Sequence, residues 1–308
     1  MGVNKISQAI LEFVKAQVPE EDILINEPMK KHTTFRIGGE AECLVRISKW
    51  QQLSILIPYL QKVEAPYFIL GNGSNLLISD QGYKGIVLQL SNRLNALSYE
   101  GNCIVAEAGA LMSQVAAFAM EHSLTGLEFA SGIPGTIGGG VVMNAGAYGG
   151  EMQQIIESVT VMNNEGEILE LSNDTMEFGY RTSIIKSRPF IVLAVKLRLQ
   201  PGNREEIPAK MSELASRRKE KQPLEYASAG STFKRPEGNF AGKLIMDAGL
   251  RGYSVGGARV SEKHCGFVIN AGNATASDVA EVIRDVQDRV KDKFGVSLET
   301  EVIFLGEF

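Results

Sequence analysis

One segment of the chain is far richer in glycine than the rest. Between residues 126 and 150, nine of 25 positions are glycine, against 32 glycines in all 308 residues. Large apolar side chains lie between these glycines, whereas a flexible linker would carry serines and charges. Because glycine lets a backbone approach another group closely, the pattern predicts a folded segment that packs tightly against backbone or against a ligand.

A second glycine loop, Gly-Asn-Gly-Ser-Asn at residues 71–75, follows a predicted strand. It is not a Walker loop, because the GxxxxGK[ST] pattern is absent. It is not a dinucleotide fingerprint either, because Leu76 stands at the sixth position and a strand follows where a helix should begin. Consecutive N–H groups in such a loop can bind an anion. The alternatives are an ordinary hairpin loop here and backbone packed on backbone in residues 126–150.

The longer segment also contains a turn motif. Gly132-Ile133-Pro134-Gly135 predicts a type II turn, with proline at the first central position and Gly135 at the second, where φ is positive. Residues 126–150 contain no lysine or arginine. A phosphate or flavin would therefore be bound there by backbone donors and by side-chain amides such as that of Asn144.

The composition is that of a globular protein, with 44% hydrophobic and 22% charged residues. A net charge of −5 and a pI near 5.5 speak against nucleic-acid binding. No apolar run reaches the roughly 18 residues of a membrane-spanning helix, and charges occupy the N-terminal segment, so we expect a cytoplasmic protein without a membrane partner. The three cysteines are far apart and lack ligand spacing, so neither a disulfide nor a metal site is predicted.

Periodicity predicts a chain that contains both helices and strands. Helices are expected at 6–14, from a cap at Ser48 with a bend or early end at Pro58, and at 111–121, 207–221 and 240–248. A last helix is expected from a cap at Ser277 to Gly295. Strands are expected at 41–47, 67–70, 76–79, 85–90, 103–108, 158–162, 167–171, 191–199 and 297–305. With a linker at 201–203, we expect domains at 1–90 (joined by strand 299–308), 91–200 and 201–298.

Seven motifs occur in the order of one known family. They are HTTFRIGG (32–39), GNGSNLL (71–77), GIPGTIGG (132–139), NAGAYG (144–149), GYRTS (179–183), GSTFKRP (230–236) and LETEV (298–302). Over essentially its whole length the chain resembles the UDP-N-acetylenolpyruvoylglucosamine reductases, in their shorter type without an extra tyrosine loop. The resemblance implies a FAD-binding fold of the vanillyl-alcohol oxidase type, made of two α+β subdomains, with a third, substrate-binding domain. One departure is Ala227, where proline is common, which could loosen the loop of Ser231.

The resemblance implies an NADPH-dependent flavoenzyme with noncovalent FAD. NADPH would reduce the FAD, and the flavin would pass hydride to the enolpyruvyl ether of a UDP-linked sugar. The product would be UDP-N-acetylmuramate, a peptidoglycan precursor needed for cell wall, cell shape and cell division. We expect a monomer, and we expect no covalent bond from flavin to His32, although some oxidases of this fold use histidine. The residues expected to bind FAD are Thr33, Thr34, Phe35, Gly71, Asn72, Gly73, Ser74, Asn75, Leu76, Gly132, Ile133, Pro134, Gly135, Thr136, Gly138, Gly139, Asn144, Ala145 and Gly146.

Three residues match the catalytic positions of the family. Arg181 would bind the substrate carboxylate through two parallel hydrogen bonds, and Ser231 would protonate the α-carbon. Glu301 would donate a hydrogen bond or orient a water. Glu299 is a competitor, because residues two apart on a strand face the same side, and only the motif favours Glu301. The alternatives are a surface arginine, a turn-forming serine and a solvated glutamate.

Further polar residues are candidates for the substrate. Lys234 and Arg235 would meet the UDP pyrophosphate or the carboxylate, and Tyr180 a phosphate. Weaker candidates are Arg217, Arg218 and Gln222, because a charged helix end is usually a solvated face. For His264 both a structural and a substrate-binding role remain open.

Two other classes of function remain open. One is an FAD-dependent oxidase of the same fold, which would use oxygen as acceptor. The other is a non-catalytic protein that binds flavin or nucleotide. The GSTFKRP and LETEV motifs weigh against the first, and the joint presence of Arg181, Ser231 and Glu301 weighs against the second.

Overall fold

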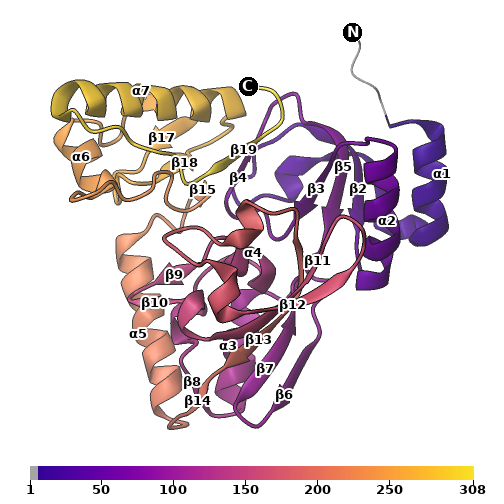
Figure 1. Ribbon diagram of the computed structural model, residues 1–308. Coiled ribbons are helices and arrows are strands. Elements are labelled where there is room, and N and C mark those ends of the chain that lie inside the picture. The colour runs from indigo at the N-terminus through magenta and orange to yellow at the C-terminus, as the bar shows by residue number, and fades with distance from the viewer. Residues whose placement is uncertain (1–5) are drawn as a thin grey trace. The chain divides into compact units, whose positions relative to one another are not determined.

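The computed structural model describes residues 6–308, and Figure 1 shows its mixture of helices and strands, which confirms the α+β class. The helices are α1 (Gln8–Gln17), α2 (Trp50–Lys62), α3 (Met112–Glu121), α4 (Ile137–Val142), α5 (Glu206–Lys221), α6 (Ala241–Asp247) and α7 (Ala276–Phe294). The strands are β1 (Ile23–Pro28), β2 (Glu40–Arg46), β3 (Tyr67–Leu70), β4 (Leu76–Ile78), β5 (Tyr83–Gln89), β6 (Leu97–Glu100), β7 (Cys103–Glu107), β8 (Leu124–Thr125), β9 (Gly146–Ala147), β10 (Gly150–Glu151), β11 (Ile156–Met162), β12 (Ile168–Ser172), β13 (Ile191–Arg198), β14 (Gln200–Pro201), β15 (Ala227–Ser228), β16 (Ser254–Val255), β17 (Ala258–Val260), β18 (Val268–Asn270) and β19 (Ile303–Leu305).

The chain forms two compact units. Unit 1 contains the residues up to Ile25, Cys43–Asn72 and Gly85–Arg218. Unit 2 contains Asn26–Glu42, Gly73–Lys84 and Lys219–Phe308. The loop at 71–75 is divided between the units after Asn72. The predicted boundaries at 90, 200 and 298 stay predictions.

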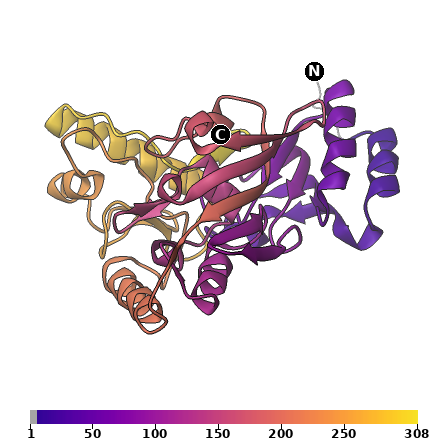
Figure 2. The ribbon, with the colours of Figure 1, turned by 60° about the horizontal axis from the view of Figure 1, so that its bottom comes forward.

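The largest sheet lies in unit 1 and has the order β12-β11-β13-β7-β6, with every neighbouring pair antiparallel. Figure 2 shows the long strands β11 and β13 crossing the unit. Apolar side chains alternate inward along them, as a half-buried strand requires. Val159, Val161, Val195 and Leu197 are fully buried. Helix α4, the centre of the glycine-rich segment, packs on β13 and β7.

A second sheet has the order β1-β2-β5-β3, in which β3 and β5 are parallel. Helix α2 buries Leu56, Ile57 and Leu60. The predicted cap at Ser48 is wrong, because its hydroxyl donates to Gln52; the Gln52 side chain instead accepts the N–H groups of residues 48 and 49. The predicted early end at Pro58 does not occur, and the helix continues to Lys62 because its apolar face is buried.

Unit 2 is built on the small antiparallel sheet β15-β18-β17-β16, with α7 packed against it (Figure 1). The cap of α7 is Thr275 and not Ser277, since the Thr275 hydroxyl accepts the N–H of Asp278 at 3.0 Å. The carboxylate of Asp80 accepts the N–H groups of Ala276 and Ser277 at 2.7 and 2.9 Å. Gly295 ends the helix in the left-handed region, as predicted.

The C-terminal strand is shorter than predicted. Strand β19 begins at Ile303 and lies parallel to β4. Before it, Thr300 forms an isolated antiparallel bridge with Phe233, so residues 297–302 are not one continuous strand. Among residues 6–308, no helix has the length and apolar character needed to cross a membrane.

Candidate active site

In unit 1 the two glycine segments meet. The Asn72 side chain donates to the carbonyl oxygen of Pro134 at 2.5 Å. A Cβ placed on Gly71 would lie 2.6 Å from the Thr136 hydroxyl oxygen, so only glycine allows this approach. Residues some sixty positions apart therefore form one surface, which the sequence suggested only as two separate loops.

The start of α4 is closed by protein contacts. Thr136 caps the helix and accepts the N–H of Gly139 at 3.3 Å, while the N–H groups of Ile137 and Gly138 donate to the carbonyls of Ala110 and Ala108. A Cβ on Gly138 would lie 2.8 Å from that of Ala108. For Gly138 the structure therefore favours backbone packing over anion binding. Gly139 is exposed and leaves the helix surface bare.

The predicted type II turn at residues 132–135 is wrong. A type II turn needs a positive φ at its second central residue. Gly135 does not have one, although sixteen other glycines of the described chain do. Its carbonyl accepts the N–H of Met112 at 2.9 Å, and this bond to the start of α3 sets the local conformation.

In unit 2 the second half of the 71–75 loop lies on the HTTF segment. Gly73 has a φ of +60°, and its carbonyl accepts the N–H of Thr34 at 3.2 Å. The backbone N–H groups of Gly73, Ser74 and Asn75 have no acceptor within residues 6–308, although Gly73 is buried. Buried donors in native proteins nearly always find a partner, so the Gly73 donor, with those of the half-buried Ser74 and Asn75 beside it, fits an anionic ligand.

The HTTF side chains have mixed orientations. Phe35 is fully buried in the core of unit 2, and the Thr33 hydroxyl donates to the Ile37 carbonyl. Only their backbone could meet a cofactor. The Thr34 hydroxyl donates to the carbonyl of Ser228 at 2.7 Å and so links the segment to the loop of Ser231. His32 contacts Glu27 at 3.0 Å.

Ser231 and Glu301 lie on neighbouring backbone segments of unit 2. The Glu301 N–H donates to the Thr232 carbonyl at 2.8 Å. Thr232 is fully buried, and its hydroxyl accepts the N–H of Val268. This buried threonine anchors the loop and leaves Ser231 exposed. The loop at residues 71–75 reaches the same place, because the Asn75 side chain donates to the Glu301 carbonyl at 3.0 Å.

Glu299 makes a side-chain contact that strand alternation could not predict. Glu299 forms an ion pair with Lys234, with 2.9 Å between Nζ and Oε2. The hydrogen bond from Lys234 lowers the pKa of Glu299, so this carboxyl is ionised at neutral pH and is a poor proton donor. Glu301 is half-buried.

Arg181 lies in unit 1 on a strained turn. Its φ is +56°, a left-handed conformation that is uncommon outside glycine and frequent at functional sites. Its guanidinium donates to the Gly146 carbonyl at 3.3 Å and lies 5.1 Å from the centre of the Tyr180 ring. The side chain of Asn144 holds the turn in place. Its amide nitrogen donates to the Gly179 carbonyl, and its amide oxygen accepts the N–H of Gln153. Both ends of this side chain therefore serve the fold.

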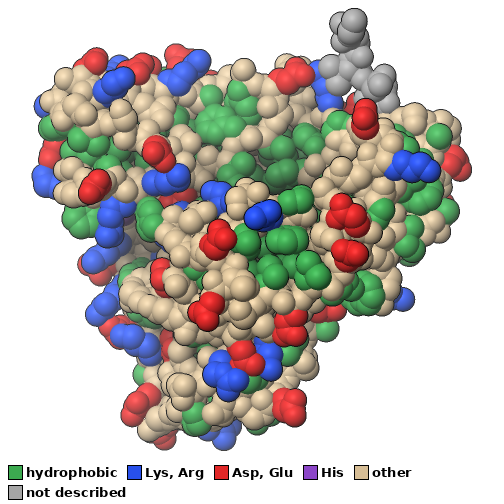
Figure 3. Space-filling model, in the orientation of Figure 1, with side chains coloured by type: hydrophobic (Ala, Val, Ile, Leu, Met, Phe, Trp, Pro, Cys, Tyr) green, Lys and Arg blue, Asp and Glu red, His purple; other side chains and the backbone are tan. Residues whose placement is uncertain are grey.

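At the end of α5 the two arginines differ. Arg217 is exposed and pairs with Glu213 at 2.6 Å, and Figure 3 shows acidic and basic side chains interspersed along this helix. For Arg217 the structure therefore favours the alternative of a solvated helix face. Arg218 is half-buried beside Gly132, makes no ion pair within the described chain, and has its pKa lowered by burial. Arg218 is therefore the stronger anion-binding candidate, which the sequence ranked no higher than its neighbour.

Two further candidates lie in unit 2. The side-chain oxygen of Gln222 is buried and has no hydrogen-bond partner within residues 6–308, so a ligand donor fits it. His264 accepts the N–H of Gly266 at 3.1 Å through Nδ1, and burial lowers its pKa. A neutral ring with the proton on Nε2 follows from that bond. The Gly266 carbonyl accepts the N–H of Thr232, next to Ser231.

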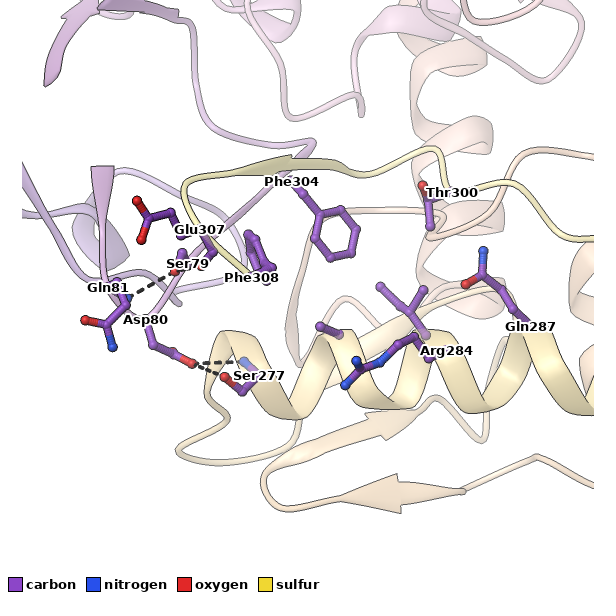
Figure 4. A pocket seen from close by; sticks show the side chains of 12 residues that line it. Ser79, Asp80, Gln81, Ser277, Arg284, Gln287, Thr300, Phe304, Glu307 and Phe308 are labelled. Carbon is purple, nitrogen blue, oxygen red and sulfur yellow. Dashed lines mark hydrogen bonds between the residues drawn. The ribbon is translucent and has the colours of Figure 1, made fainter. Parts of the chain in front are cut away.

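Unit 2 also has a hollow of about 580 Å³ between α7 and the segment that ends in β19 (Figure 4). Phe304, Phe308, Arg284 and Thr300 are among its lining residues. Neither Ser231 nor Glu301 lines it. Because Thr300 lines the hollow, its side chain faces α7.

Comparison with known proteins identifies these parts. Residues 41–172 match a family model described as an FAD binding domain, and residues 222–305 match one for the C-terminal domain of UDP-N-acetylenolpyruvoylglucosamine reductase. The reductase of Caldanaerobacter subterraneus subsp. tengcongensis is 53% identical, over 98% of this chain and 100% of that protein. The one from Clostridioides difficile is 52% identical, over 94% and 95%. The crystal structure of the Thermus caldophilus reductase gives a TM-score of 0.79 at 36% identity, over 92% and 98%.

A matched FAD-binding domain in a chain whose relatives are reductases defines an FAD-dependent oxidoreductase. The prediction of the flavin-binding fold is confirmed, as is that of FAD with NADPH as hydride donor. The chain belongs to the UDP-N-acetylenolpyruvoylglucosamine reductase family. The oxidase and the non-catalytic binding protein are not favoured by these matches.

Proposed function

We propose that the protein reduces the enolpyruvyl ether of UDP-N-acetylglucosamine-enolpyruvate to UDP-N-acetylmuramate by means of Arg181, Ser231 and Glu301. The observation that carries the assignment is the direct hydrogen bonding between the segments of Ser231 and Glu301, joined by Asn75 of the cofactor loop. We further propose that the enzyme acts as a monomer in the cytoplasm, where its product supports cell shape and division.

The chain fits FAD without a covalent bond. The unpaired N–H groups of residues 73–75 suit a pyrophosphate, and Asn72, whose side chain donates to Pro134, precedes them in the sequence. When bound, the flavin accepts hydride from NADPH and supplies it to the methylene carbon of the substrate. His32 has Glu27 as its neighbour and is not needed for attachment.

Arg181 would hold the substrate carboxylate. Hydride addition places negative charge on the carbon next to that carboxylate, and a permanent cation stabilises it most when it is fixed in advance. The left-handed turn and the bond to Gly146 fix the guanidinium in this way. Tyr180, which lies beneath the guanidinium, would meet a phosphate of the same substrate.

Ser231 would then protonate the α-carbon. A serine hydroxyl is a weak acid, but the carbanionic species is a strong base, so a positioned hydroxyl suffices. The buried Thr232 fixes that position. Glu301 would orient the hydroxyl or a water beside it. Ala227, which the sequence marked as a departure, pairs with Asn270 in the sheet and so ties the start of this loop to β18.

The UDP group would be bound mainly by unit 2. Lys234 and Arg235 lie three and four positions after Ser231. Gln222 offers its unpaired oxygen to a donor such as a sugar hydroxyl or the uracil N–H. Arg218 would add a further cation beside Gly132, in the glycine-rich segment 126–150. Arg217 would contribute only weakly, since Glu213 already binds it.

The test is anaerobic reduction of the yellow protein by NADPH, followed by the enolpyruvyl nucleotide. We expect bleaching in the first step and full return of the flavin spectrum in the second. Return of colour only when oxygen is admitted would indicate an oxidase. Failure of NADPH to bleach the flavin would indicate a binding protein.

A further inference from the structure

The pairing of residues 232–234 with 299–301 defines which side chains share a face. The Lys234 N–H donates to the Glu299 carbonyl at 2.9 Å, and the Glu301 N–H donates to the Thr232 carbonyl at 2.8 Å. These two bonds flank the bridge of Phe233 and Thr300, which are opposite each other. In such a pair, opposite residues point to the same face and successive residues alternate.

Phe233 and Thr300 therefore mark one face, on the side of the core and of the hollow in Figure 4. Lys234, Glu299 and Glu301 belong to the other face. The ion pair between Lys234 and Glu299 confirms this alternation. The lysine proposed to bind the anionic substrate and the proposed catalytic glutamate thus share a face with a second carboxylate.

Glu299 is an unusual neighbour for such a site. Its side chain is 74% exposed and that of Lys234 is 34% exposed, so the pair adds little to the stability of the fold. A fixed negative charge on this face also opposes an anionic ligand, in a chain whose net charge is already −5. Its effect is therefore expected in ligand binding.

We propose that Glu299 is an exchangeable counter-ion: it holds Lys234 while the site is empty and gives up the ammonium to the phosphate or carboxylate of the UDP-linked substrate. This inference rests on the proposed substrate role of Lys234. The ammonium has three donors, of which Glu299 takes one. A substrate oxygen can approach before Glu299 leaves, and Glu299 can return as product departs.

The exchange predicts that removing the charge of Glu299 strengthens substrate binding. Release of Lys234 from this exposed ion pair, which contributes little by itself, corresponds to roughly a two- to fivefold change in affinity. Glu299→Gln keeps the size and a hydrogen-bond acceptor but removes this competition. We expect the dissociation constant of the enolpyruvyl nucleotide to fall by that factor.

The experiment is a calorimetric titration of the oxidised, FAD-loaded enzyme with the enolpyruvyl nucleotide, in the absence of NADPH. The variants are Glu299→Gln, Lys234→Met and the double variant. Glu237→Gln, which removes the same charge from the exposed loop after Ser231, is the matched control and should bind like the wild type. Lys234→Met should weaken binding, and adding Glu299→Gln to it should change nothing further.

Each other outcome has a definite meaning. Weaker binding by Glu299→Gln would show that Glu299 orients Lys234, which overturns the exchange. Tighter binding that persists in the Lys234→Met background would show direct repulsion of the ligand and overturn it as well. If Lys234→Met binds the nucleotide normally, Lys234 lies outside the substrate site, and the inference falls while the proposed reaction stands. The reaction itself is tested separately by the NADPH and nucleotide steps above.

Discussion

Replacing Gly73 by alanine tests whether the 71–75 loop holds FAD through its backbone. Gly73 has a φ of +60°, and an added Cβ would overlap the carbonyl oxygen of His32. It would also lie 3.0 Å from the carbonyl carbon of His32 and from the Cα of Thr33. All these atoms are backbone, so the loop and the HTTF segment must separate.

Two contributions set the size of the effect. The left-handed conformation costs an alanine about 1–2 kcal/mol wherever it occurs. Separation also breaks the hydrogen bond from Thr34 to Gly73, about 1 kcal/mol, and moves the three donors of residues 73–75 away from the pyrophosphate. Bonds to a charged group contribute about 1.5–3 kcal/mol each, so the loss of one alone weakens FAD binding by about 2 kcal/mol, or roughly thirtyfold.

The assay is the dissociation constant of FAD, from flavin fluorescence on adding FAD to apoprotein. Gly101→Ala is the matched control, because Gly101 has a φ of +58° and nothing lies within 4 Å of its Cβ position. It carries the same backbone strain without the overlap, and we expect it to lose stability but keep its FAD affinity. Wild-type affinity in Gly73→Ala, or an equal loss in Gly101→Ala, would refute the reasoning.

Three further outcomes are expected. Acid precipitation should leave the yellow colour in the supernatant, whereas colour in the pellet would indicate a bond to His32. Ser231→Ala should be reduced by NADPH at nearly the normal rate in stopped-flow absorbance, but its reoxidation by the nucleotide should slow at least ~10²–10⁴-fold, as for loss of a general acid; normal reoxidation would place the proton elsewhere. Iodoacetamide at pH 8 should spare Cys43, because burial raises its pKa to about 12 and keeps it a thiol, and should label the less buried Cys103 first; early labelling of Cys43 in mass spectra would contradict this.

Periodicity and turn residues predicted most elements of the fold, because their apolar faces are continuous in sequence. The errors lie at element ends, where distant partners decide. Ser277 has the right chemistry for a cap, but Thr275 takes that place and Asp80, almost two hundred residues earlier, satisfies the next donors. The last strand was predicted too long because Thr300 pairs with Phe233 instead of extending β19.

For the candidate site, the motifs supplied Arg181, Ser231 and Glu301 but not the hydrogen bonds that hold each segment in place. The distinction between Glu299 and Glu301 depends on Lys234, which no local pattern places opposite either glutamate. Gly138 illustrates the converse case. A Cβ on Gly138 would lie 2.8 Å from that of Ala108, just after β7, so close packing alone explains this glycine. A single sequence cannot show this, because packing and ligand binding both favour glycine.

The interleaved course of the chain has a consequence for how the protein folds. Unit 2 is completed only by segments that are far apart, and the bond between Asn75 and Glu301 spans 226 residues. Contacts of such high sequence separation form slowly, because a long loop must close before any of them stabilises the structure. During synthesis on a ribosome, β4 cannot pair with β19 until the C-terminus has been made. The largest sheet of unit 1 can form before that point, because all its strands are synthesised earlier. In a nascent chain the 71–75 loop is therefore exposed long before Glu301 is available to bind Asn75. Conditions that lengthen the time between the synthesis of these two residues should favour aggregation over folding.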